Sequence, residues 1–153
     1  MDETHLVTRR DERGRILRGE RYWVIGAICR NTKQVRCVLT RNRRRVDCES
    51  FILNNIYADT IIMSDLWRGY RNIDVLGYQH FNVNHSVDFV DRNNREIPTQ
   101  NIERFWRTLK EKLPTVNSFE LLKKHVNRIV FEYNERFNNS SEKFDFYLSL
   151  IKI

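Results

Sequence analysis

Short apolar runs separated by polar breaks fill the first half of the chain and predict β-strands. Residues 22–29 are almost uniformly apolar and bounded by charge, which predicts a buried strand. Residues 34–40 predict a second strand, and polar residues 31–33 predict a hairpin turn between the two. Two further runs, at 60–64 and 78–84, are short enough to be strands but not regular helices.

Helices are expected between and after these strands. Asp47 precedes an apolar pattern over residues 48–56 and is expected to cap a helix there. A short helix is expected around residues 67–72, after the strand at 60–64. Strands, helix, strand, helix and strand in this order predict an α/β layered domain.

Helical periodicity dominates after Pro98. One stripe recurs at helical spacing and ends before Pro114, and it consists of Ile102, Phe105, Trp106, Leu109 and Leu113. Asn117 and Glu120 are spaced as in a capping box, which predicts a second helix over about 119–137. A last apolar segment at 144–151 is also expected to be helical.

The charge of the chain is concentrated at one end. Its 153 residues carry a formal net charge of +7, and residues 1–45 hold 13 Lys or Arg against 5 Asp or Glu. Arginine dominates this excess, above all in the cluster Arg41, Arg43, Arg44 and Arg45. Its planar guanidinium suits phosphate oxygens, so the natural partner is a polyanion, although a solvated basic face without a ligand has the same composition.

Several classes of protein are excluded by composition. The apolar fraction of 41% supports a single domain with a real core. No apolar run reaches the roughly 18 residues that span a bilayer, and the acidic N-terminus is unlike a signal peptide. Cys29, Cys37 and Cys48 fit neither a disulfide framework nor a zinc site, so reduced core thiols are expected. We therefore expect a soluble intracellular protein without a membrane partner.

Three acidic residues occupy positions suited to chemistry. Asp65 ends the strand at 60–64, Asp2 precedes an apolar pair that can join the sheet, and Glu103 lies early on the first long helix. At 100° per residue, Glu103 and Lys110 share one flank of that helix, with Arg107 close by. Converging carboxylates are what a two-metal phosphoryl-transfer site needs. A turn or cap role for the aspartates and a surface ion pair for Glu103 are the alternatives.

Six blocks of sequence occur in a fixed order along nearly the whole chain. They are Asp2-Glu3-Thr4-His5, residues 22–28, Ser64-Asp65-Leu66-Trp67-Arg68-Gly69-Tyr70, Val83-Asn84-His85-Ser86, Phe89-Val90-Asp91 and residues 99–107. Together they resemble the DDE transposase domain of ISXO-type insertion sequences and the related Merlin elements. In addition, 37 residues separate Asp65 from Glu103, close to the interval of such families.

The resemblance implies a ribonuclease-H-like fold, dependence on two Mg²⁺ or Mn²⁺ ions, and cut-and-paste DNA transposition by a single domain over residues 1–153. It makes Asp2, Asp65 and Glu103 the catalytic metal ligands and leaves Asn101 as a reserve third ligand. The side chains expected to contact terminal-repeat or target DNA are Arg41, Arg43, Arg44, Arg45, Trp67, Arg68, His85, Arg107 and Lys110.

The family also carries an upstream DNA-reading segment, which does not precede Asp2 here, so we expect a domain whose first strand is truncated. Three hypotheses follow: a metal-dependent transposase, a truncated or inactive copy that binds DNA without catalysis, and an interaction module built on the helix at 119–137. An active form is expected to be a homo-oligomer. It would work in the nucleus of a eukaryote, or in the cytoplasm or nucleoid of a bacterium.

Overall fold

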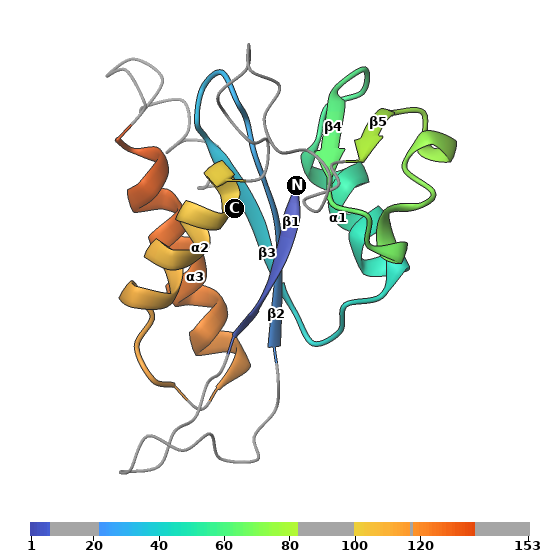
Figure 1. The fold of residues 1–153 in the computed structure, drawn as a ribbon. Helices are drawn as coiled ribbons and strands as arrows, with labels where there is room; N and C mark the ends of the chain where they lie inside the picture. The colour runs from blue at the N-terminus through green and yellow to red at the C-terminus, as the bar shows by residue number, and fades with distance from the viewer. Residues whose placement is uncertain (7–21, 83–99, 117, 137–153) are drawn as a thin grey trace, which may run out of the picture.

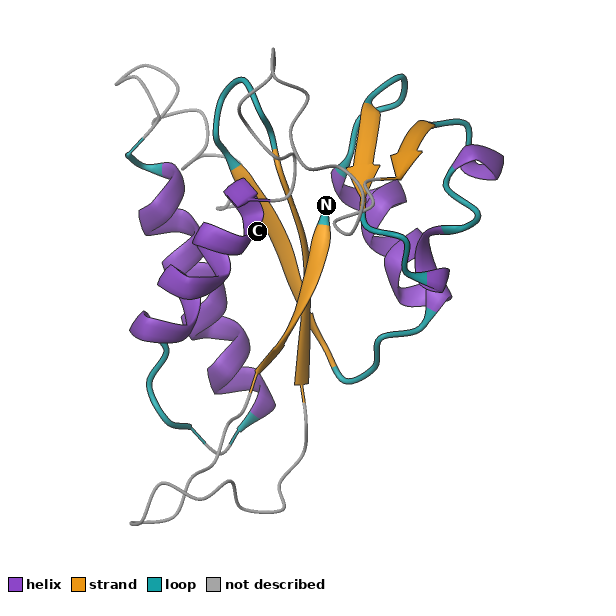
Figure 2. Cartoon of the chain, in the orientation of Figure 1, coloured by secondary structure: helices purple, strands orange, loops and turns teal. Residues whose placement is uncertain are grey.

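The computed structural model describes residues 1–6, 22–82, 100–116 and 118–136. A three-stranded antiparallel sheet in the order β1-β2-β3 lies at its centre. Its strands are β1 (Asp2–Leu6), β2 (Tyr22–Ile28) and β3 (Val35–Thr40). Helices lie on both sides of this sheet (Figures 1 and 2), so the α/β class expected from the sequence is confirmed.

A second, parallel pair of strands stands beside the start of β1. It consists of β4 (Ile61–Ser64) and β5 (Gln79–Asn82), joined through two short 3-10 helices, η1 (Arg68–Tyr70) and η2 (Asp74–Leu76). The Met1 nitrogen donates a hydrogen bond of 2.6 Å to the Met63 carbonyl oxygen of β4. The two sheets therefore meet where β1 begins and β4 ends.

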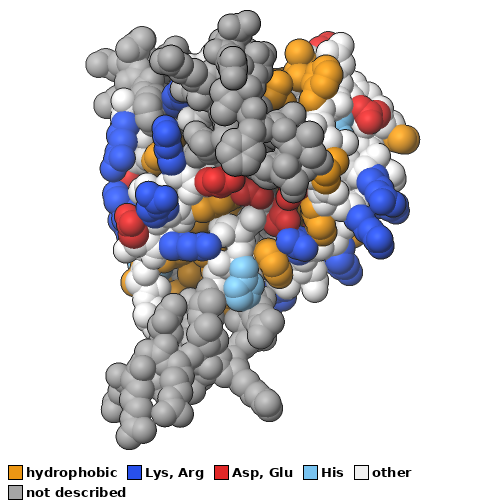
Figure 3. Space-filling view, in the orientation of Figure 1, with side chains coloured by type: hydrophobic (Ala, Val, Ile, Leu, Met, Phe, Trp, Pro, Cys, Tyr) orange, Lys and Arg blue, Asp and Glu red, His pale blue; other side chains and the backbone are white. Residues whose placement is uncertain are grey.

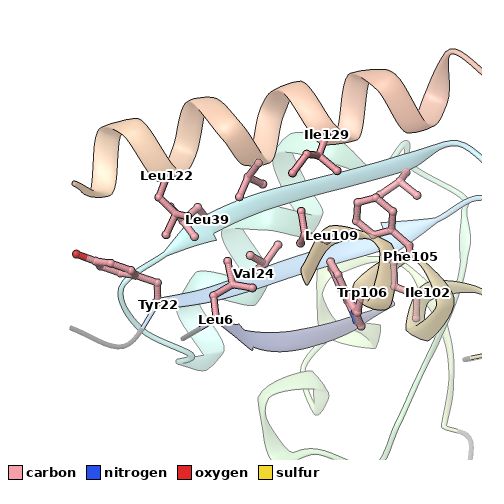
Figure 4. Close-up of a cluster of buried hydrophobic side chains, with 12 residues drawn as sticks. Leu6, Tyr22, Val24, Leu39, Ile102, Phe105, Trp106, Leu109, Leu122 and Ile129 are labelled. Atoms are coloured by element: carbon pink, nitrogen blue, oxygen red, sulfur yellow. The ribbon is translucent and has the colours of Figure 1, made fainter. Parts of the chain in front are cut away.

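The first side of the central sheet is covered by α2 (Gln100–Lys112) and α3 (Phe119–Asn134). Side chains alternate across a strand, so Val24 of β2 faces these helices while its neighbour Ile25 faces away. The α2–α3 core (Figure 4) is the cluster Leu6, Tyr22, Val24, Val35, Leu39, Ile102, Phe105, Trp106, Leu109, Leu122, Val126 and Ile129. It contains the predicted stripe, except that Leu113 is only half-buried at its margin.

The opposite side is covered by α1 (Arg45–Asn55) and by the segments around β4, η1 and η2. The α1 core is the cluster Met1, Ile25, Cys48, Phe51, Ile52, Ile62, Tyr70, Ile73 and Tyr78. Its residues come from many short elements. The apolar residues of α1 do not form a single buried stripe, since Val46 and Leu53 are exposed.

Several local expectations need correction. Asp47 does not cap α1 but occupies its third position, where its carboxylate accepts the Arg44 N–H at 2.9 Å. The short helix expected at 67–72 is present only as the 3-10 turn η1, over Arg68–Tyr70, where Gly69 leaves room for the Trp67 ring. The α3 cap is Ser118, whose Oγ accepts the Leu121 N–H at 3.4 Å.

Two other expectations concern residues elsewhere in the chain. Cys48 is buried as expected and Cys37 is half-buried, but Cys29 is exposed because it follows the end of β2. The expected helix at 144–151 lies outside the described residues. Among the helices within the described ranges, none is long and apolar enough to cross a membrane.

Candidate active site

Asp2 is held at the start of β1 by a side chain from the far end of the sequence. It is half-buried and lies on the same face of β1 as Thr4 and Leu6, which are buried under α2. The Trp106 indole Nε1–H donates a hydrogen bond of 2.8 Å to Asp2 Oδ2. Trp106 is therefore both a core residue, as its place on the apolar stripe predicted, and the partner that orients Asp2.

Gly26 makes room for this arrangement. It lies directly opposite Asp2 in the β1–β2 pairing. A Cβ added at Gly26 would lie 2.6 Å from Trp106 Cη2 and 3.0 Å from the Arg36 carbonyl oxygen, so a side chain there would displace the indole. The missing side chain thus leaves the space that the indole occupies when its N–H donates to Asp2.

Asp65 directly follows β4 and is fixed by the turn that it begins. Its Oδ1 accepts the backbone N–H of Trp67 at 3.0 Å, a local bond that holds the side chain against its own chain. The preceding residue, Ser64, is fully buried, and its Oγ donates to the Asp65 carbonyl oxygen at 3.0 Å. His80 Nε2 lies 2.8 Å from the same Oγ and ties β5 to this point.

The carboxylate of Asp65 lies close enough to Asp2 to affect the protonation of Asp2. Burial raises the pKa of Asp2 most, and the negative charge of Asp65 raises it further, while the Trp106 hydrogen bond opposes both. Glu3, the neighbour of Asp2, has a pKa raised by burial, with added repulsion from Asp2 and Asp65. Negative charge is therefore concentrated, and unfavourably so, where β1 and β4 meet.

Glu103 lies in the first turn of α2. It is exposed and lies three residues before Trp106, so the two side chains are neighbours on the helix surface. Asn101, the reserve ligand, is half-buried in the same first turn. Acidic side chains gather at the centre of this face, with Lys and Arg on both flanks (Figure 3). Within the described residues, no three His, Cys, Asp or Glu side chains already converge closely enough to hold a metal ion.

Two of the arginines expected to contact DNA stack on aromatic rings. The guanidinium of Arg43 lies 4.6 Å from the ring centroid of Trp23 and 4.3 Å from that of Trp67, and its Nη1 is 2.7 Å from Glu3 Oε1. Arg41 lies 4.6 Å from the ring centroid of Phe119. These contacts within the protein give both side chains a structural role beside the predicted one.

The remaining DNA-contact candidates are distributed over several surfaces. Arg44 and Arg45 are exposed and pair along α1 with Asp47 and Glu49, respectively. Trp67 is half-buried against the α1 core, and His85 lies outside the described residues. The fully exposed candidates on other elements are Arg68 on η1 and Arg107 and Lys110 on α2.

Several residues that organise the site were not assigned a role from the sequence. The Tyr70 hydroxyl donates a partly buried hydrogen bond to Glu3, and Ser64 Oγ pairs with His80 Nε2. The position of Glu3 next to Asp2 was a usable signal, because neighbours on a strand point to opposite faces and Glu3 must then enter the other layer. No signal in the sequence pairs Ser64 with His80.

Most of the chain is similar to known proteins. The chain is similar over residues 1–138 to the ISXO2-like transposase domain. A transposase-like protein of Haemophilus influenzae is 30% identical over 110 residues, which cover 72% of this chain and 85% of the relative. No solved structure matches. The chain is thus similar to a transposase-type domain over most of its length. The chain belongs to the ISXO2-like transposase family.

Proposed function

We propose that this domain cleaves and joins DNA strands at the ends of a mobile element, with Asp2, Asp65 and Glu103 as catalytic metal ligands. One observation carries the proposal. Asp2 on β1 and Asp65 after β4 are far apart in sequence, yet Asp65 lies close enough for its charge to raise the pKa of Asp2, while α2, which bears Glu103, is joined to Asp2 by the Trp106 hydrogen bond.

The proposal includes a ribonuclease-H-like fold. An antiparallel β1-β2-β3 unit and a parallel β4-β5 pair are the parts of such a mixed sheet. The hydrogen bond from Met1 to Met63 lies where β1 would join β4 in one continuous sheet. This strand order supports the proposed fold and explains why the ends of β1 and β4 are neighbours.

The donor chemistry fits divalent cations. Carboxylate oxygens are the hard ligands that Mg²⁺ and Mn²⁺ prefer. The hydrogen bonds from Trp106 to Asp2 and from Trp67 to Asp65 each engage one oxygen, and a carboxylate has about four lone-pair sites. Two like charges in a partly buried site are also an arrangement that a cation stabilises. Two bound ions would supply an activated water and stabilise the attacking and leaving oxygens.

The chain's own residues have three tasks in this reaction. Asp2, Asp65 and Glu103 would hold the metal ions. Trp106 fixes the orientation of Asp2, since its rigid indole is clamped between α2 and β2. The exposed Arg107 and Lys110, on the helix of Glu103, neutralise DNA phosphates near the reacting bond. Positioning and charge neutralisation are the main protein contributions to phosphoryl transfer.

A strand-cleavage assay with terminal-repeat DNA and Mn²⁺ or Mg²⁺ tests the proposal. The protein is expected to nick the element end and join it to target DNA, and chelation is expected to stop both steps. Asp65→Asn should reduce both to background because it removes a ligand charge without changing side-chain size.

The matched control is Asp59→Asn. Asp59 is an exposed aspartate in a turn with φ of 63°, a conformation that asparagine accepts well. Its substitution should leave nicking and joining unchanged. Equal activity of the Asp65 and Asp59 variants would contradict the catalytic assignment.

A second candidate, DNA binding without catalysis, is favoured by the basic N-terminal third of the chain. It predicts duplex binding that weakens steeply with salt, needs no metal and survives Asp65→Asn. Binding that is insensitive to salt would contradict it. The same samples used in the cleavage assay separate the two functions.

A further inference from the structure

A partly buried chain of contacts links β1, which carries Asp2, to the segment that begins with Asp65 after β4, on the side of the sheet away from Trp106. It consists of Glu3, Tyr70, Arg43 and Trp67. We infer that these residues are positioning residues that set the separation between Asp2 and Asp65. The inference rests on the proposed function, because the separation matters if the two carboxylates share metal ions.

Glu3 anchors the β1 end of this chain. Its side chain is only 3% exposed and enters the layer of the α1 core, while its neighbour Asp2 faces α2. Oε2 accepts a hydrogen bond from the Tyr70 hydroxyl, and Oε1 accepts one of 2.7 Å from Arg43 Nη1. With both oxygens engaged by protein donors, Glu3 serves as a tie between segments rather than as a metal ligand.

Tyr70 and Trp67 carry the contact to the β4 end. Tyr70 is fully buried, and burial together with the charge of Glu3 raises its pKa. The hydroxyl therefore stays protonated and donates a hydrogen bond to Glu3. The ring of Tyr70 meets the ring of Trp67 edge-on, with centroids 5.2 Å apart. The backbone N–H of Trp67 then holds Asp65 Oδ1 at 3.0 Å.

Gly69 allows the two rings to pack in this way. A Cβ at Gly69 would lie 1.8 Å from Trp67 Cζ3, so the indole occupies the space that any other residue would fill. The segment from Asp65 to Tyr70 is therefore a compact unit whose shape depends on the indole.

Arg43 follows β3 and is the last member of this network. Its guanidinium lies between the rings of Trp23 and Trp67 and meets Glu3, so it connects β2, the Asp65 segment and β1. The positive charge also offsets the burial of Glu3, whose pKa it lowers. This position suits a structural cation better than a mobile side chain that must reach DNA.

A positioning role follows from rigidity and adjacency. Glu3 directly follows Asp2 on β1, so a displacement of Glu3 also displaces Asp2. At the other end, the backbone N–H of Trp67 donates directly to Asp65. Active-site geometry tolerates only small displacements, and residues that orient metal ligands typically change metal affinity by about 10–100-fold when substituted.

Tyr70→Phe tests the inference, with Tyr78→Phe as the matched control. Tyr78 is also a buried tyrosine of the α1 core, but its hydroxyl donates to the Ile56 carbonyl oxygen at 3.0 Å, away from both carboxylates. Two readouts are used: Mn²⁺ affinity by calorimetry, and the ¹H–¹⁵N resonances of the Trp67 amide and the Trp106 indole, which report on Asp65 and Asp2.

We expect Tyr70→Phe to weaken Mn²⁺ binding about 10–100-fold and to shift both resonances. Tyr78→Phe should change neither. Glu3→Gln, which keeps the side-chain shape but loses the charge facing Arg43, should act in the same direction if Tyr70→Phe does not fold. Equal effects of the Tyr70 and Tyr78 variants on both readouts would overturn the inference.

Failure of the proposed function gives a different result. If the unmodified protein binds no Mn²⁺ while Tyr70→Phe still shifts the Trp67 and Trp106 resonances, the network positions the two aspartates but they are not metal ligands. If Mn²⁺ binds equally to all variants, the metal site stands and the positioning role is wrong.

Discussion

The two sides of the central sheet are stabilised in different ways. The α2–α3 core uses two long helices, of 13 and 16 residues, whose apolar stripes pack on one face of the sheet. The α1 core combines one helix with short strands and 3-10 turns, and its tyrosine hydroxyls are bonded to Glu3 and to the Ile56 carbonyl. Regular apolar packing thus fixes α2, the helix that carries Glu103. Polar contacts between short segments fix the segment that carries Asp65.

The largest effect in this comparison is expected from truncating the α2–α3 core. Phe105 is fully buried between the rings of Trp106 and Tyr133, so Phe105→Ala leaves a cavity and should destabilise the fold by about 3–5 kcal/mol. Urea denaturation measures the loss. Phe81→Ala, at a phenylalanine that is 54% exposed, is the control and should change stability by less than about 1 kcal/mol. Similar losses would show that α2 is not docked by this core.

An intermediate effect is expected at Gly26, where the apolar side meets the site. Gly26→Ala places a methyl group against the Trp106 ring and should destabilise the fold by about 1–3 kcal/mol, with a shifted Trp106 indole resonance. Adding Trp106→Phe, which removes the atoms in conflict, should make the combined loss smaller than the sum of the single losses in a double-mutant cycle. Additive losses would contradict the direct contact.

The smallest effect concerns pH and the β4–β5 side. Burial lowers the pKa of His80 below its ordinary value of 6.5, with opposing influence from Asp74. As the pH falls, the imidazole of His80 is protonated at a higher pH in the unfolded chain than in the folded protein. The stability contributed by neutral His80 is therefore complete above pH 6.5 and is lost as the pH falls through and below that value. His80→Gln should remove this part of the decline. The prediction is contradicted if the free energies of unfolding of the unmodified protein and of His80→Gln differ by the same amount at pH 5 and at pH 8.

The same contrast explains what could be predicted from the sequence. The stripe from Ile102 to Leu109 predicted α2 and its buried face, because helical periodicity and burial coincide there. Around η1 the local pattern was ambiguous, since Gly69 is present to admit the Trp67 ring rather than to end a helix. Such a contact depends on tertiary packing that no local pattern encodes.

The candidate site shows the same division. The strand end at Asp65 and the early helical position of Glu103 were visible as positions in elements. The hydrogen bond that joins Asp2 to Trp106 spans 104 positions of sequence, and the bond between Glu3 and Tyr70 spans 67. Partners at such separations depend on how layers pack, so the residues that orient the carboxylates emerged only from the structure.

Anomalous diffraction from crystals grown with Mn²⁺ tests the central claim most directly, because the signal locates the metal independently of any assay. The account predicts manganese within about 2.5 Å of carboxylate oxygens from Asp2, Asp65 and Glu103 together. Manganese bound elsewhere, or bound to the aspartates with Glu103 directed away into solvent, would contradict it.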